Sequence, residues 1–100
     1  MEFQQTLSNG STVLRIVGEF DSITAPDLRP TFDDVASRQP QKVVLDLSGL
    51  RLIDSSGIGA IVSLFKRVRA YGGVFEVSGV QGQPRSIFKV LRLDKVFDIA

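Results

Sequence analysis

The sequence predicts an α/β protein, with a mixed β-sheet that begins with an antiparallel hairpin and carries about three to four helices mainly on one face. Asn9-Gly10, a strong hairpin signal, separates two runs of β-forming residues. An apolar run over 43–47, a short polar turn and an amphipathic run over 58–68 indicate a strand, a turn and a helix. Charged residues interrupt several predicted strands, whereas strands covered on both faces are continuously apolar. One face of the sheet is therefore expected to be partly wet.

The composition excludes several classes of function. The length of 100 residues is that of one domain, and we expect residues 1–100 to form a single one. The net charge of +1 indicates no strong attraction to nucleic acid or to a membrane surface. The absence of Cys and His excludes disulfides, a Ser-His-Asp triad and most transition-metal sites. The N-terminus does not resemble a signal peptide, and the longest uncharged apolar stretch, 55–65, is too short to span a bilayer. We expect a cytoplasmic protein that uses no cofactor.

Period-2 patterns predict four strands before the C-terminal segment. They lie over 2–7, 12–17, 42–47 and 74–77. A loop over 18–21, which holds two carboxylates, follows the second strand. In the third strand, Val43, Leu45 and Leu47 share one face. The last residues, 96–99, are expected to form a short final strand or a docked tail.

Two helices flank the central part of the chain. The first begins after Thr24, the expected N-cap, and ends before Pro40. Ile23 and Leu28 occupy the positions of a hydrophobic staple around that cap. Its apolar stripe consists of Leu28, Phe32, Val35 and Ala36. The other helix opens at Pro84, and its expected core face consists of Ile87, Phe88 and Leu91.

The helix between them is expected from about Ser56 to Tyr71 and is ended by Gly72-Gly73. Its apolar stripe, predicted to face the sheet, consists of Ile58, Ile61, Val62, Phe65 and Val68. The opposite strip consists of Ser55, Gly59, Ser63 and Arg67. Its small residues leave a shallow surface that another backbone could approach. Alternatively, Gly59 only eases packing of the helix against the sheet.

The turn Asp54-Ser55-Ser56-Gly57 is the candidate functional site. One acceptor suffices to cap the helix, so Asp54 could be the cap and leave the Ser55 hydroxyl free. A helix N-terminus carries unpaired N–H groups and a partial positive charge, which favour an added phosphoryl group. Phosphorylation of Ser55 would then spare the fold and repel a partner that fits the neutral surface. The structural alternative is that the turn only caps the helix.

The carboxylates of the loop over 18–21 are expected near the same edge of the sheet as Ser55. They could position a partner, polarise the serine hydroxyl or only solvate the loop. Catalysis has weak support, because Ser55 has no His to activate it and no complete phosphate-binding glycine motif is present. An aspartyl-phosphate receiver-like domain would need Asp46 or Asp54 as its acceptor, and the early hairpin argues against it.

The segments Val43–Gly49 and Ile53–Gly59 resemble the signature of the STAS domain, and more narrowly that of bacterial anti-sigma factor antagonists. The residues 18–21, Gly72-Gly73 and 91–99 match further blocks of this family in the same order. The resemblance covers essentially the whole chain, and it implies a STAS-like mixed sheet with helices packed on it.

The resemblance also implies a partner-switching cycle. In this family an anti-sigma factor, a serine kinase of the histidine-kinase-like ATPase fold, phosphorylates the first serine of the turn. The unphosphorylated antagonist binds this kinase and frees its sigma factor, and a PP2C-type serine phosphatase resets the switch. Carried over by position, Ser55 is the phosphorylation site, and Asp21 and Asp54 assist kinase docking or serine positioning. The expected contact surface includes Ser56, Gly57, Gly59 and Ser63.

No direct nucleic-acid or membrane partner and no enzymatic activity are expected. The alternative function is that of a constitutive scaffold subunit of a stressosome or of a lipid-transport complex, in which Ser55 is only a helix cap.

Overall fold

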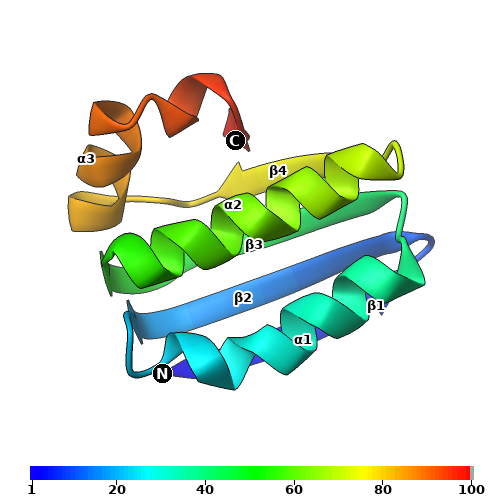
Figure 1. Ribbon diagram of the computed structural model, residues 1–100, viewed down its shortest axis with the longest axis horizontal. Helices are drawn as coiled ribbons and strands as arrows, with labels where there is room; N and C mark the ends of the chain where they lie inside the picture. Colours follow the sequence, from blue (N-terminus) through cyan, green and yellow to red (C-terminus); the bar gives the residue numbers. More distant parts are fainter. Residues whose placement is uncertain (100) are drawn as a thin grey trace.

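The computed structural model describes residues 1–99, in which a five-stranded sheet has the order β1-β2-β3-β4-β5 (Figure 1). The strands are β1 (Glu2–Ser8), β2 (Ser11–Phe20), β3 (Lys42–Ile53), β4 (Val74–Ser78) and β5 (Asp98–Ile99). β1 and β2 pair antiparallel, and every later pair is parallel. The predicted mixed sheet with an N-terminal hairpin is therefore confirmed.

The hairpin turns at Asn9-Gly10, as predicted. Both residues have positive φ, 47° and 82°, and Ser8 pairs with Ser11 across the turn. This is the two-residue geometry that matches the twist of the flanking strands.

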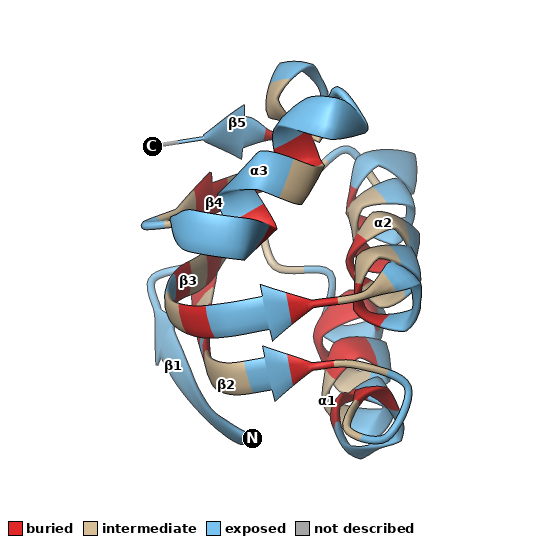
Figure 2. Cartoon of the chain, turned by 90° about the vertical axis from the view of Figure 1, so that its left-hand side faces the viewer, coloured by how far each residue is buried: buried red, intermediate tan, exposed pale blue. Residues whose placement is uncertain are grey.

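Three helices and one short 3-10 turn accompany the sheet. They are α1 (Ala25–Arg38), α2 (Ser55–Ala70), α3 (Gly82–Val90) and the turn Leu93–Lys95. α1 and α2 lie side by side on one face, and α3 lies near the end of β4 where the chain leaves the sheet (Figures 1 and 2). The prediction of helices mainly on one face is confirmed.

The face of the sheet away from α1 and α2 carries several charged side chains. Arg15 lies 3.9 Å from Asp46, and Lys42 lies 3.5 Å from Glu76, each as an ion pair between neighbouring strands. The charges that interrupt the strand patterns therefore pair with one another on the open face. Exposed and half-exposed pairs of this kind contribute little to stability, about 1 kcal/mol or less each.

The core lies between the sheet and the helices. Alternate residues of the central strands point into it and are fully buried, including Leu14, Ile16, Val43, Leu45, Leu47 and Val77. At the β4 edge, Phe97 packs against the rings of Phe65, Phe75 and Phe88 with centroids 5.1–5.7 Å apart. This aromatic cluster anchors the C-terminal segment. The segment is therefore docked through Phe97 and ends in the short strand β5.

The start of α1 differs from the prediction. Thr24 occupies the N-cap position but makes no capping bond; its hydroxyl donates to the Glu19 carbonyl at 2.8 Å and accepts from the Asp21 N–H. Ile23 is 83% exposed, so the expected staple with Leu28 does not form. The cause is Asp21, whose carboxylate binds the N–H groups of Ile23 and Thr24 and turns this loop outward.

The ends of two strands and the buried faces of two helices also differ from the prediction. β2 continues to Phe20 and β3 to Ile53, because the two strands stay paired beyond the segments that look like strands in the sequence. On α2 the fully buried stripe is Gly57, Ile61, Leu64 and Val68, whereas Ile58, Val62 and Phe65 are only partly buried. Leu91 is 47% exposed, because α3 ends at Val90 and the chain turns away through Arg92 with φ 59°.

Candidate functional site

The predicted turn lies where β3 ends and α2 begins. Asp54 has an extended backbone, and its Oδ1 accepts hydrogen bonds from the N–H groups of Ser56 and Gly57 at 2.9 and 3.2 Å. Asp54 is therefore the N-cap of α2, and it satisfies two of the donors that a helix N-terminus leaves unpaired. The serines of the turn are not needed for this task.

Ser55 is the first residue of α2 and is exposed. Within residues 1–99, its hydroxyl makes no hydrogen bond to another group. The hydroxyl lies at the positive end of the helix dipole, where added negative charge is favoured. The geometry thus presents an accessible hydroxyl at a place that can hold a phosphoryl group.

The loop that holds Asp21 lies beside this turn. Asp54 Oδ2 accepts a hydrogen bond from the Ser22 N–H at 3.2 Å, and the Asp54 N–H donates to the Phe20 carbonyl at the same distance. These two bonds join the segment between β2 and α1 to the start of α2. The expectation that the carboxylates of 18–21 lie at the same edge as Ser55 is confirmed.

Asp21 itself organises its own loop. Its Oδ1 accepts from the N–H groups of Ile23 and Thr24, each at 3.0 Å, and from the Thr24 hydroxyl at 3.2 Å. The hydrogen bond from the Thr24 backbone is the largest cause that lowers the pKa of Asp21. None of the hydrogen bonds among the described residues joins Asp21 or Asp54 to the Ser55 hydroxyl, so the structure does not show them polarising it. Both carboxylates shape the surface around Ser55 instead.

The strip of α2 opposite the sheet is exposed, as predicted. Ser55, Gly59, Ser63 and Arg67 follow one another along it at intervals of one helical turn. A Cβ built on Gly59 would meet no atom within 4 Å. Gly59 therefore does not serve packing of the helix against the sheet, and the alternative that it keeps the surface shallow is the one the structure favours.

Gly57 lies beneath the expected contact surface and not on it. It is buried, and a Cβ there would lie 2.5 Å from the Phe20 carbonyl oxygen and 2.7 Å from Ile53 Cγ1. The glycine is needed so that the first turn of α2 can pack directly on the ends of β2 and β3. Ser56, by contrast, is exposed and borders the surface.

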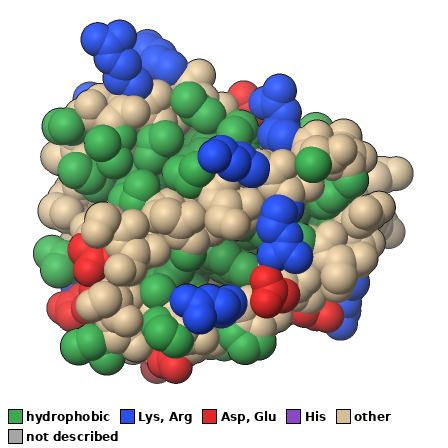
Figure 3. All heavy atoms as spheres, viewed as in Figure 1, with side chains coloured by type: hydrophobic (Ala, Val, Ile, Leu, Met, Phe, Trp, Pro, Cys, Tyr) green, Lys and Arg blue, Asp and Glu red, His purple; other side chains and the backbone are tan. Residues whose placement is uncertain are grey.

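A groove of about 420 Å³ separates α1 from α2 and begins at this turn. Its walls include Ser22 and Ser56 at one end and the ion pair of Arg67 with Asp33, 2.7 Å apart, at the other. Figure 3 shows the hollow from the helix side, with hydrophobic side chains between the helices and charged side chains at its margin. Ser56, Ala60 and Ser63 of α2 line this groove, which the sequence pattern did not predict.

Two exposed apolar residues near the turn also escaped prediction. Ile23, in the loop between β2 and α1, is 83% exposed, and Leu52, near the end of β3, is 46% exposed. Single exposed apolar residues are common on protein surfaces, so these two gain meaning only from their position beside the Ser55 turn. The sequence did contain a sign of the exposed Ile23, because an isoleucine stands there in the middle of an otherwise polar loop.

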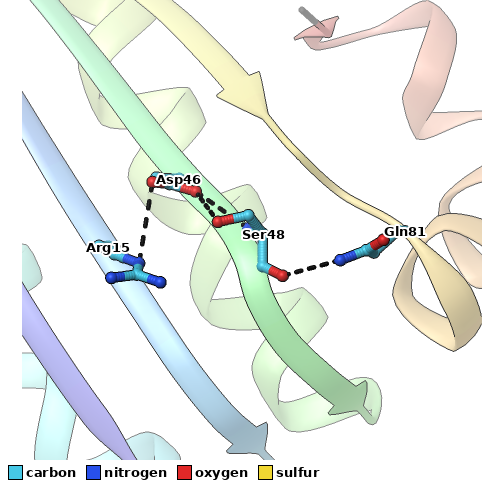
Figure 4. Close-up of polar contacts among 4 residues, drawn as sticks. All are labelled: Arg15, Asp46, Ser48 and Gln81. Atoms are coloured by element: carbon cyan, nitrogen blue, oxygen red, sulfur yellow. Dashed lines mark hydrogen bonds and ion pairs between the residues drawn. The ribbon is translucent and has the colours of Figure 1, made fainter.

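A second serine and carboxylate lie on the open face of the sheet (Figure 4). The Ser48 hydroxyl donates to Asp46 at 2.7 Å, and Asp46 also faces Arg15. Burial tends to raise the pKa of Asp46, but the hydroxyl and N–H of Ser48, together with Arg15, hold it below its ordinary value. Asp46 lies in mid-strand and is fully engaged, so the acceptor geometry of a receiver domain is not present here.

The described residues offer neither a metal site nor a membrane-spanning helix. Among residues 1–99, no three acidic, His or Cys side chains are grouped so that they could hold a metal ion. No helix in that same range is long and apolar enough to cross a membrane.

The chain belongs to the STAS domain family, whose model matches residues 2–100. Relatives of this chain include anti-sigma factor antagonists. The anti-sigma F factor antagonist of Paenibacillus polymyxa is 28% identical over 100 residues, which are 99% of this chain and 86% of that protein.

Solved structures show the same relationship. An anti-sigma factor antagonist from Mycobacterium paratuberculosis has a TM-score of 0.88 at 26% identity, over 98% of this chain and 83% of that one. The Bacillus cell fate determinant SpoIIAA in its phosphorylated form has a TM-score of 0.79 at 20% identity, over 99% of this chain and 91% of that one. The second likeness shows a shared fold.

Proposed function

We propose that this chain is an anti-sigma factor antagonist that works by partner switching, with Ser55 as its phosphorylation site. The observation that carries the proposal is that Asp54 alone caps α2, which leaves Ser55 with a free hydroxyl. The names of the relatives support it, and SpoIIAA, which shares the fold, is known in unphosphorylated and phosphorylated forms.

In this proposal the partner is an anti-sigma factor that is also a serine kinase of the histidine-kinase-like ATPase fold. It transfers the γ-phosphoryl group of ATP to Ser55 Oγ, the hydroxyl proton leaves to a base of the kinase, and ADP is released. A PP2C-type phosphatase hydrolyses the phosphoserine and resets the switch. The cycle runs in the cytoplasm, needs no cofactor of this chain and involves no contact with nucleic acid or membrane.

The proposed contact surface combines small and apolar residues around Ser55. It includes the exposed serines at 22, 56 and 63 and the bare backbone at Gly59, over which a partner backbone can approach. Ile23 and Leu52 are its apolar anchors. Asp21 and Asp54 hold the loops that display these side chains, and Gly57 contributes only by letting α2 pack closely.

Phosphorylation would switch this surface through charge. A phosphoserine carries nearly two negative charges at neutral pH. The helix N-terminus accepts them in the free protein, whereas a packed and partly dry interface does not. Moving a partner from mostly bound to mostly free takes roughly 3–5 kcal/mol of differential affinity, which is within reach of such a charge.

The test is a pull-down from the native lysate with wild type, Ser55→Ala, Ser55→Asp and Ser37→Asp as baits. Ser37 is exposed near the end of α1, at the opposite end of the helix pair from Ser55 (Figure 1), so its variant is a matched charge control. We expect a kinase of the stated fold with every bait except Ser55→Asp. Circular dichroism must first show that all four baits are folded.

The alternative function predicts a different pattern. If all baits retain the same proteins, Ser55 is not a switch and the chain is a constitutive scaffold. If purified kinase, ATP and Mg²⁺ place acid-stable phosphate on wild type but not on Ser55→Ala, the assignment of the phosphorylation site stands independently of the pull-down.

A further inference from the structure

β3 is longer than the strand beside it. β4 pairs with β3 only from Lys42 to Asp46, whereas β3 continues to Ile53. The rest of β3 therefore has no strand on its β4 side. The chain that leaves β4 passes into α3 near this uncovered part (Figure 1).

Two glutamine side chains replace the missing strand. Gln81 Nε2 donates to the Ser48 carbonyl at 2.9 Å (Figure 4). Gln83 Nε2 donates to the Ile53 carbonyl, and Gln83 Oε1 accepts from the Ile53 N–H, both at 2.9 Å. A primary amide offers a donor and an acceptor side by side, as a peptide group does. Gln83 thus satisfies both backbone groups of one residue, as a neighbouring strand would.

Ile53 is the support of the Ser55 turn. It directly precedes the capping residue Asp54, whose N–H is held on the other side by the Phe20 carbonyl. The Ile53 side chain is 2% exposed, and together with the Phe20 carbonyl it leaves no space for a side chain at position 57 of α2. The backbone that places the Asp54 carboxylate is therefore held from β2 on one side and from α3 on the other.

We propose that Gln83 is a positioning residue for the Ser55 turn. Its amide fixes Ile53, and through Ile53 it fixes the cap of α2 and the direction of the Ser55 hydroxyl. Its effect on phosphorylation rests on the proposed function of Ser55, whereas its effect on the geometry of the turn does not. Gln81 makes the same kind of bond but at Ser48, away from the turn, and so offers a matched control.

The first test measures the turn itself. Gln83→Met and Gln81→Met keep the length of the side chain and remove its hydrogen bonds. We expect amide hydrogen exchange of Ser56 and Gly57 to become about tenfold faster in Gln83→Met, the factor associated with loss of a buried hydrogen-bonded contact. Exchange there should be unchanged in Gln81→Met. Equal exchange at these amides in wild type and Gln83→Met overturns the proposal.

The second test measures phosphoryl transfer, with the kinase recovered by the wild-type bait. Misplacing an acceptor hydroxyl slows transfer without removing the docking surface. We expect kcat to fall about tenfold in Gln83→Met at unchanged KM, with Gln81→Met like wild type. A loss of stability alone changes neither parameter well below the melting temperature.

The outcomes separate the two proposals. If wild type is not phosphorylated, the proposed function fails, and the exchange experiment still decides whether Gln83 holds the turn. If wild type and Gln83→Met are phosphorylated with the same kcat, the switch stands and the role of Gln83 in it is overturned.

Discussion

Two glycines of α2, Gly57 and Gly59, lie two residues apart and should respond to alanine in opposite ways. At Gly57 the new methyl group would lie 2.5 Å from the Phe20 carbonyl oxygen and 2.7 Å from Ile53 Cγ1. The first of these atoms is backbone and cannot move without shifting β2. Overpacking of this kind costs about 3 kcal/mol, the upper end of the usual range.

At Gly59 the methyl group would meet no atom within 4 Å. Alanine in a helix interior is then better than glycine by about 1 kcal/mol, because the unfolded chain loses less freedom on folding. For a domain of this size, about 1 kcal/mol shifts the melting temperature by about 4–8 °C. Gly59→Ala should therefore melt a few degrees higher than wild type, and Gly57→Ala should melt more than about 10 °C lower.

Urea unfolding followed by circular dichroism measures both free energies, and equal m-values show that the comparison is valid. A Gly57→Ala variant as stable as wild type, or a clearly destabilised Gly59→Ala variant, would contradict the packing described for these two glycines. Gly59→Ala also tests the contact surface. A variant that is more stable but binds the proposed kinase more weakly would show that the bare backbone serves the partner.

Two further predictions concern the carboxylates that hold the site. Replacing Asp54 by Ala removes the cap of α2 and should cost about 1–2 kcal/mol of unfolding free energy in urea, whereas Asp54→Asn, which keeps an acceptor oxygen, should lose less; equal stability of all three proteins would contradict the capping role. The lowered pKa of Asp21 means that its contribution to stability is complete above its unfolded pKa, near 4, and is lost as the pH falls through the lower folded value. Asp21→Asn should therefore flatten the decline of unfolding free energy below about pH 4, and an unchanged slope would argue against that contribution.

Local rules predicted the parts of the fold that local chemistry determines. The hairpin follows from the two turn residues that accept positive φ, and the cap of α2 follows from Asp54. The open face of the sheet follows from the charges in mid-strand, such as Arg15 and Asp46, which pair across strands. Each of these features depends on neighbours in sequence or on a simple alternation.

The features that were missed depend on contacts between distant segments. The end of β3 could not be predicted, because its last residues are held by Phe20 and Gln83, far away in the chain. The burial of Gly57 arises because the ends of β2 and β3 meet beneath α2. Ile23 fits the staple pattern, but its N–H donates a hydrogen bond to the Asp21 carboxylate, and this bond turns the loop outward.

The order of the strands has a consequence for how the protein is made. The sheet order equals the chain order, so each strand can add to an edge that was synthesised before it. The N-terminal part of a chain is synthesised first, so β1 to α2 are available for pairing before the remainder has left the ribosome. The amide of Gln83, however, arrives only with α3. A nascent chain of which only residues 1–81 have left the ribosome should therefore contain a nearly complete sheet with a loosely held Ser55 turn, which proteolysis or hydrogen exchange would detect.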